Sequence, residues 1–82
     1  MDFPVLTPMQ LGAVLRGFRR QRGLTQAQLA DRVGLTQKAI SIIETHPERI
    51  GVARVFRVLS ALEAQWVLRD KVSARPSPRA QW

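Results

Sequence analysis

The chain has 82 residues, enough for one small domain and too few for two. Its 13 Lys and Arg outnumber its six Asp and Glu, giving a formal net charge of +7. This excess favours a polyanionic partner, nucleic acid first and a membrane surface second. The absence of cysteine excludes disulfides and thiolate metal sites. With no apolar run of membrane-spanning length and no signal-peptide pattern, we expect a cytoplasmic protein.

Three threonines mark predicted helix starts. Thr7 and Thr25 are each followed three positions later by Gln, the spacing of a capping box, whereas Thr36 keeps the cap without the Gln. Each threonine is preceded by Leu and followed, four positions into the helix, by Leu or Ile, as in a hydrophobic staple. Helices should therefore begin directly after these three residues.

Glycine and proline predict where those helices stop. Gly23 and Gly34 can each supply the left-handed residue that commonly follows a helix. Pro47 disfavours helical geometry at the residue before it, so the third helix should end near residues 44–45. A fourth helix, with a broad apolar stripe, is predicted over residues 52–62.

The pattern changes after the fourth helix. Trp66 and Leu68 alternate with Val67, which predicts a short strand. A lone strand has unpaired edges, and its own copy in a second subunit is the simplest partner. These three residues are therefore candidate dimerisation residues, and a small domain gains stability from such pairing. The alternative is that the segment extends the fourth helix.

We expect a mainly α fold of four to five helices with one short C-terminal strand that pairs across a dimer. The expected organisation is an N-terminal arm at 1–6, a helix-turn-helix domain at 7–63, a dimerisation strand at 64–71 and a disordered C-terminal tail at 72–82.

The third predicted helix carries the candidate chemistry. It follows the turn "RVGLTQ", the spacing of a helix-turn-helix. Polar residues form one stripe, and Gln, Lys and Ser can hydrogen-bond to base edges in the major groove while Ile can touch a thymine methyl. Gln26, at the start of the second helix, can help to hold a phosphate. The candidate DNA-binding residues are Gln26, Thr36, Gln37, Lys38, Ser41, Ile42 and Thr45. Alternatively, the polar stripe of the third predicted helix is the solvated face of an ordinary amphipathic helix.

Other polar residues indicate structure rather than chemistry. Arg19 borders the apolar stripe of the first helix and Glu44 lies near the apolar side of the third, which favours an ion pair between the helices. The single histidine, His46, has no second His or Cys with which to form a nucleophilic or metal site. Carboxylates are scattered and the sequence has no glycine-rich phosphate loop. We therefore expect that the protein is not an enzyme and binds no metal or cofactor.

The segment "LRGFRRQRGLTQAQLADRVGLTQKAISIIE" resembles the Cro/C1-type (XRE) helix-turn-helix family of phage repressors and bacterial regulators. The resemblance implies that Gln26 and Gln37 contact DNA, that Lys38 faces the groove together with Ser41 and Ile42, and that Arg19 pairs with Glu44. The sequence departs from the family after Glu44, where "THPERI" replaces a commoner Asn-Gly turn.

A narrower resemblance covers nearly the whole chain. The opening "LTPMQLG", the segment "TQKAISIIE", the predicted strand and a basic tail that ends in Trp are similar to the HipB antitoxins. That resemblance implies a homodimer that represses its own operon at inverted-repeat operators and binds a HipA-like serine/threonine kinase toxin. It also implies that Trp82 inserts into a pocket on the toxin.

Three alternatives stay open. In the first, the chain is a solitary repressor without a toxin. In the second, it is the DNA-binding member of a system in which another protein neutralises the kinase. In the third, it is a basic protein-interaction or membrane-surface module. Composition alone would make Trp82 incidental.

Overall fold

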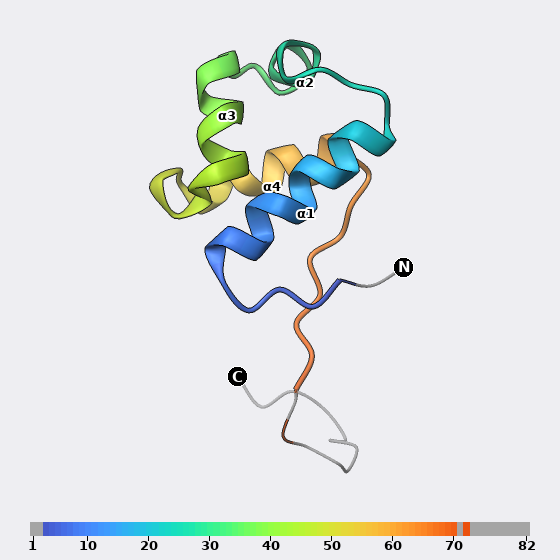
Figure 1. The fold of residues 1–82 in the computed structure, drawn as a ribbon, viewed down its shortest axis with the longest axis vertical. Helices are drawn as coiled ribbons and strands as arrows, with labels where there is room; N and C mark the ends of the chain where they lie inside the picture. The colour runs from blue at the N-terminus through green and yellow to red at the C-terminus, as the bar shows by residue number, and fades with distance from the viewer. Residues whose placement is uncertain (1–2, 71, 73–82) are drawn as a thin grey trace.

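Four α-helices and one 3₁₀ helix make up the fold in the computed structural model, which describes residues 3–70 and 72. The elements are α1 (Pro8–Gln21), α2 (Gln26–Val33), α3 (Gln37–Thr45), η1 (Pro47–Arg49) and α4 (Val52–Ala61). Figure 1 shows α1 in front of α4, with α2 at one end of the molecule and α3 along its side. The expected mainly α class is confirmed.

Local hydrogen bonds explain why the first three helices begin where they do. The hydroxyl oxygens of Thr7 and Thr25 accept bonds from backbone N–H groups three residues on, both at 3.1 Å. The following glutamines return a bond to each threonine N–H, which completes both capping boxes. Thr36 accepts a bond from the N–H of Ala39 at 3.0 Å. All three predicted starts are confirmed.

Three of the four α-helices, α1, α2 and α4, are followed by a residue in the left-handed conformation. Gly23 and Gly34 have φ values of 72° and 69°, where a side chain would be strained. The third such residue is Glu63, with φ of 55°, directly after α4. There the N–H of Ala64 donates to the carbonyl oxygen of Leu59 at 2.9 Å, closing the helix end. The fourth helix therefore stops one residue before the predicted position.

The core lies where α3 meets α1 and α2, and where α2 meets α4. Its largest fully buried side chains come from all four helices and the end of α4, namely Leu15, Leu29, Ile40, Ile43, Val58 and Leu62. Burial of these side chains, rather than helix propensity alone, stabilises helices as short as α2 and α3.

The segment "THPERI", where the sequence departs from the family pattern, forms a defined structure. "THPERI" ends α3 and then makes η1, whose Pro47 is buried where η1 packs against α1 and α3. His46 Nδ1 lies 3.4 Å from Glu48 Oε2, with both side chains at least half exposed. The segment therefore links α3 to α4 through a packed turn.

Residues 64–70 form neither helix nor strand in this single chain and run away from the helices (Figure 1). The alternative that they extend α4 is wrong, because Glu63 ends that helix. A strand is defined by its hydrogen-bonded partner, so strand pairing with a second subunit stays a prediction.

Candidate nucleic-acid interface

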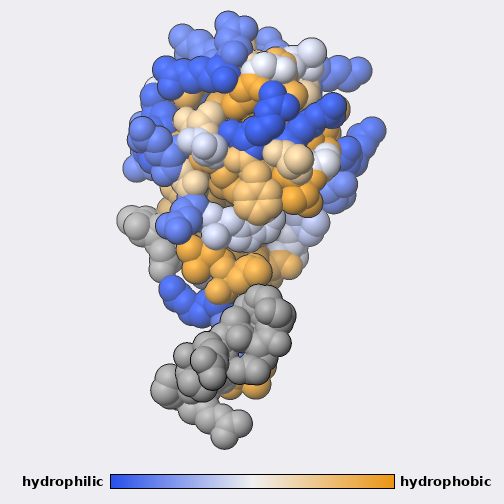
Figure 2. Space-filling model, turned by 180° about the vertical axis from the view of Figure 1, so that it is seen from behind, coloured by the Kyte–Doolittle hydropathy of each residue, from blue (hydrophilic) through white to orange (hydrophobic). Residues whose placement is uncertain are grey.

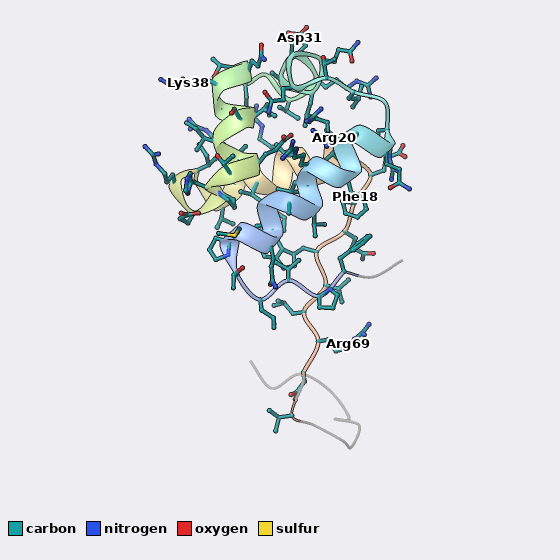
Figure 3. The ribbon with its side chains drawn as sticks, viewed as in Figure 1. Phe18, Arg20, Asp31, Lys38 and Arg69 are labelled. Carbon is teal, nitrogen blue, oxygen red and sulfur yellow. The ribbon has the colours of Figure 1, made fainter. Side chains whose placement is uncertain are left out.

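The helix α3 is two-sided. Ile40 and Ile43 are fully buried and hold the helix on the core, while Gln37 and Lys38 are exposed. Figure 3 shows Lys38 at the outer end of α3, pointing away from the rest of the molecule. Neither exposed side chain forms a hydrogen bond or ion pair within the part of the chain that the structure describes. Their donors are available to an external partner.

The other candidate residues on α3 differ in how far their polar groups are already used. Ser41 and Ile42 are half-buried, beside the exposed Gln37 and Lys38. The hydroxyl of Thr45 donates to the carbonyl oxygen of Ser41 at 2.9 Å, which leaves its oxygen as an acceptor only. Thr36 already accepts the capping bond from α3. The two threonines therefore shape the ends of α3, and the groups best placed to read bases are those between them.

The side chain of Gln26, at the start of α2, lies beside Glu44 in the last turn of α3. Gln26 Nε2 donates to Glu44 Oε1 at 3.2 Å, a contact that sequence reasoning missed. The capping box satisfies the N–H groups of Thr25 and Gln28. This leaves the N–H groups of Gln26 and Ala27 as first-turn donors without a helical acceptor, an arrangement suited to a phosphate oxygen.

A buried ion pair holds the C-terminal end of α3 against α1. Arg19 Nε donates to Glu44 Oε2 at 2.6 Å, and Arg19 Nη2 donates to Glu44 Oε1 at 3.2 Å. Arg19 Nη1 also donates to the carbonyl oxygen of Leu24 at 2.8 Å. Both residues are more than nine-tenths buried, and no buried side-chain polar atom among the described residues lacks a partner. The pair joins the first helix, the loop before α2, and α3.

Sequence reasoning also missed Gly12, which lets α1 approach the end of α3. A Cβ atom built at Gly12 would lie 2.4 Å from the backbone oxygen of Glu44 and 2.8 Å from its carbonyl carbon. Backbone atoms cannot turn aside as a side chain can, so only glycine fits there. The available signal was a glycine inside a helical pattern, which costs about 1 kcal/mol relative to Ala and indicates a packing reason.

The predicted dimerisation residues form an exposed apolar surface. Trp66, Val67 and Leu68 are 40%, 58% and 91% exposed. The ring of Trp66 lies 5.5 Å from that of Phe56 on α4, which is itself half exposed together with Val52. Figure 2 shows apolar surface at the centre of the face opposite to that seen in Figure 1, framed by hydrophilic side chains. The expected apolar stripe of α4 is thus only partly buried in one chain.

The remaining predictions concern other parts of the chain. Trp82 lies outside the described residues. Among the residues described, no three or more His, Cys, Asp or Glu side chains cluster as a metal site would require. In the same residues, no helix has the length and apolar character needed to cross a membrane.

Comparison with known proteins agrees with this geometry. A helix-turn-helix domain family matches residues 10–72. Antitoxin HipB of Escherichia coli is 32% identical over 77 residues, covering 94% of this chain and 88% of HipB. A solved HipA–HipB–O2–O3 complex contains a chain that is 31% identical, with a TM-score of 0.79 over 85% of this chain and 99% of that one. A HipB–O4 20mer complex gives a TM-score of 0.78 at 31% identity, with the same coverage of both chains. This chain belongs to the HipB family of helix-turn-helix antitoxins.

Proposed function

We propose that this chain is a cytoplasmic, homodimeric repressor that binds an inverted-repeat operator in double-stranded DNA and controls its own toxin–antitoxin operon. The observation that carries the proposal is the polar stripe of α3, whose Gln37 and Lys38 are exposed while Ile40 and Ile43 anchor the opposite side. A helix held in this way can enter the major groove with its donors unpaired.

Phosphate contacts would come from the neighbouring elements. The N–H groups at the start of α2 lie beside Gln26, and the chain carries a net charge of +7. Such contacts position the protein without reading sequence, and they make affinity fall with salt. In this proposal Gln26 positions the protein and the α3 stripe supplies specificity, with Thr36, Ser41, Ile42 and Thr45 bordering the bases.

The dimer in this proposal is closed by residues 64–71. Trp66, Val67 and Leu68 would pair with their copies and cover the apolar surface that one chain leaves exposed. A twofold dimer would place two α3 helices in successive major grooves, about 34 Å apart. It therefore requires an inverted-repeat operator.

The proposed partner protein is a HipA-like serine/threonine kinase toxin. Its support is the HipB relationship, which includes a solved complex containing both HipA and HipB. The proposal assigns the kinase contact to the C-terminal tail, residues 72–82, with Trp82 as its anchor.

The double substitution Gln37→Ala with Lys38→Ala tests the DNA-binding proposal. Each good base contact contributes about 1–3 kcal/mol of discrimination, so we expect the double variant to lose operator preference while keeping its fold. Footprinting on the chain's own promoter region, with circular dichroism as the fold check, measures both.

The control for lost charge is Arg54→Ala, which removes one cation from the exposed surface of α4. Its footprint should keep the operator pattern. An unchanged footprint for the double variant would remove α3 from the proposed interface, whatever the total affinity.

A further inference from the structure

The side chain of Arg57 reaches from α4 to the turn between α2 and α3. Its Nη2 donates to the carbonyl oxygen of Val33, the last residue of α2. The same nitrogen lies 3.3 Å from the position that a Cβ atom at Gly34 would occupy. The guanidinium group therefore lies over the turn that leads into α3.

The side chain of Arg57 supplies a hydrogen-bond donor where the turn most lacks one, at the end of α2. The last carbonyl groups of a helix have no partner within the helix and carry partial negative charge. A charged donor forms a stronger hydrogen bond to such an oxygen than a neutral donor does. The cation at Arg57 is therefore suited to hold the end of α2.

Few other bonds hold the turn in place. The N–H groups of Gly34 and Leu35 both donate to Ala30, within α2 itself. Among residues 3–70 and 72, the side chain of Arg57 is the only one from another helix that forms a hydrogen bond to residues 33–36. The next residues along the chain are Gln37 and Lys38, so any movement of the turn moves the exposed end of α3.

We propose that Arg57 is a positioning residue for DNA reading, which keeps α3 in the orientation that matches the major groove. Without it, only a fraction of molecules would hold the competent orientation, and apparent affinity would fall by that fraction. The loss should be larger on operator DNA than on other DNA, because base contacts need a defined geometry and phosphate contacts tolerate more variation. This inference rests on the proposed DNA-binding function.

The test compares Arg57→Met with Arg54→Met. Both substitutions remove one cation from α4 and keep an unbranched side chain, but Arg54 lies one turn earlier and forms no hydrogen bond or ion pair with a described residue. The probes are a 20-base-pair duplex, selected from random sequence by the unsubstituted chain, and a scrambled duplex of the same composition. Affinity for each is measured over a series of salt concentrations.

For Arg57→Met we expect operator affinity to fall about fivefold or more, while affinity for the scrambled duplex and the salt dependence stay at wild-type values. Arg57→Lys, which keeps a cation near the end of α2, should recover part of the loss. Equal weakening on both duplexes, with a log–log salt slope shallower by about 0.9 per protomer, would show a phosphate contact and overturn the inference. Unchanged operator affinity would overturn it too.

A measurement without DNA separates this inference from the proposed function. Amide hydrogen exchange at Gly34 and Leu35 should be faster in Arg57→Met than in Arg54→Met or the unsubstituted chain, because both N–H groups lie in the turn. Faster exchange in a chain that prefers no DNA sequence would refute the proposed function and uphold the positioning of the turn. Unchanged exchange would refute the positioning itself.

Discussion

At the scale of single residues, the structure separates two glycines that look alike in the sequence. Gly12 and Gly17 both lie inside α1. A Cβ atom at Gly12 would overlap the backbone of Glu44, whereas one at Gly17 would meet nothing within 4 Å. The first glycine is required by the approach of α1 to α3, and the second only adds backbone freedom to the unfolded chain.

Alanine at each position should therefore have opposite effects. Gly17→Ala is expected to raise the free energy of unfolding by about 0.5–1 kcal/mol, because it restricts the unfolded chain and adds no clash. Gly12→Ala should lower it by about 1–3 kcal/mol, because α1 must move away from α3. Urea unfolding of the two variants measures the difference, and a stabilised Gly12→Ala would show that the helices are not in contact there.

The Arg19–Glu44 pair also belongs to this scale. Sequence position alone indicated that the two residues face each other, and they lie 25 positions apart in the chain. The structure adds Gln26 as a third partner, which donates to Oε1, the same carboxylate oxygen that accepts from Arg19 Nη2. A candidate DNA contact is thus oriented by the same buried carboxylate that joins the helices.

At the scale of elements, helix starts were predictable and one helix end was not. The capping bonds of Thr7, Thr25 and Thr36 join residues three positions apart, so the sequence pattern contains both partners. The end of α4 depends instead on Glu63, which adopts a left-handed conformation without being glycine. No residue pattern marks such a position, because the strain is accepted for the sake of the surrounding packing.

Relieving that strain should stabilise the protein. Glu63→Gly is expected to raise the free energy of unfolding by about 1 kcal/mol, because glycine adopts this conformation without steric cost. Glu63→Ala is the matched control, since it removes the same charge but keeps a Cβ atom. Thermal unfolding should show a gain for glycine alone, and an equal gain for both variants would assign the effect to charge.

At the scale of the whole molecule, the candidate DNA-reading surface and the exposed apolar surface lie in different regions. Lys38 projects from α3, whereas Arg69 marks the C-terminal segment at the other end of the molecule (Figure 3). The ring contact of Phe56 with Trp66 lies where α4 meets the C-terminal segment. Figure 2 shows apolar surface at the centre of the face opposite to that seen in Figure 1. DNA reading and subunit pairing can therefore occur together, as the proposed repressor requires.

The kinase contact is a separate prediction at this scale. Trp82→Ala should weaken binding of the proposed HipA-like kinase partner by about thirtyfold or more, as for a buried tryptophan at an interface hot spot. Operator binding should stay unchanged, because the α3 stripe is intact. Calorimetry with the full chain measures kinase binding, and Gln81→Ala, one residue earlier in the same tail, is the control. Equal kinase affinity for both variants and the unsubstituted chain would refute the anchor.

By itself, the sequence determined the features that depend on neighbouring residues. These are the three capped helix starts, the glycine turn between α2 and α3, the two-sided character of α3, and the motifs that carry the relationship to HipB. Only the tertiary structure decided which distant groups meet, because such contacts depend on how the helices pack. The bond of Arg57 to Val33, 24 positions earlier, the approach of Gly12 to Glu44, and the end of α4 at Glu63 all arise in that way.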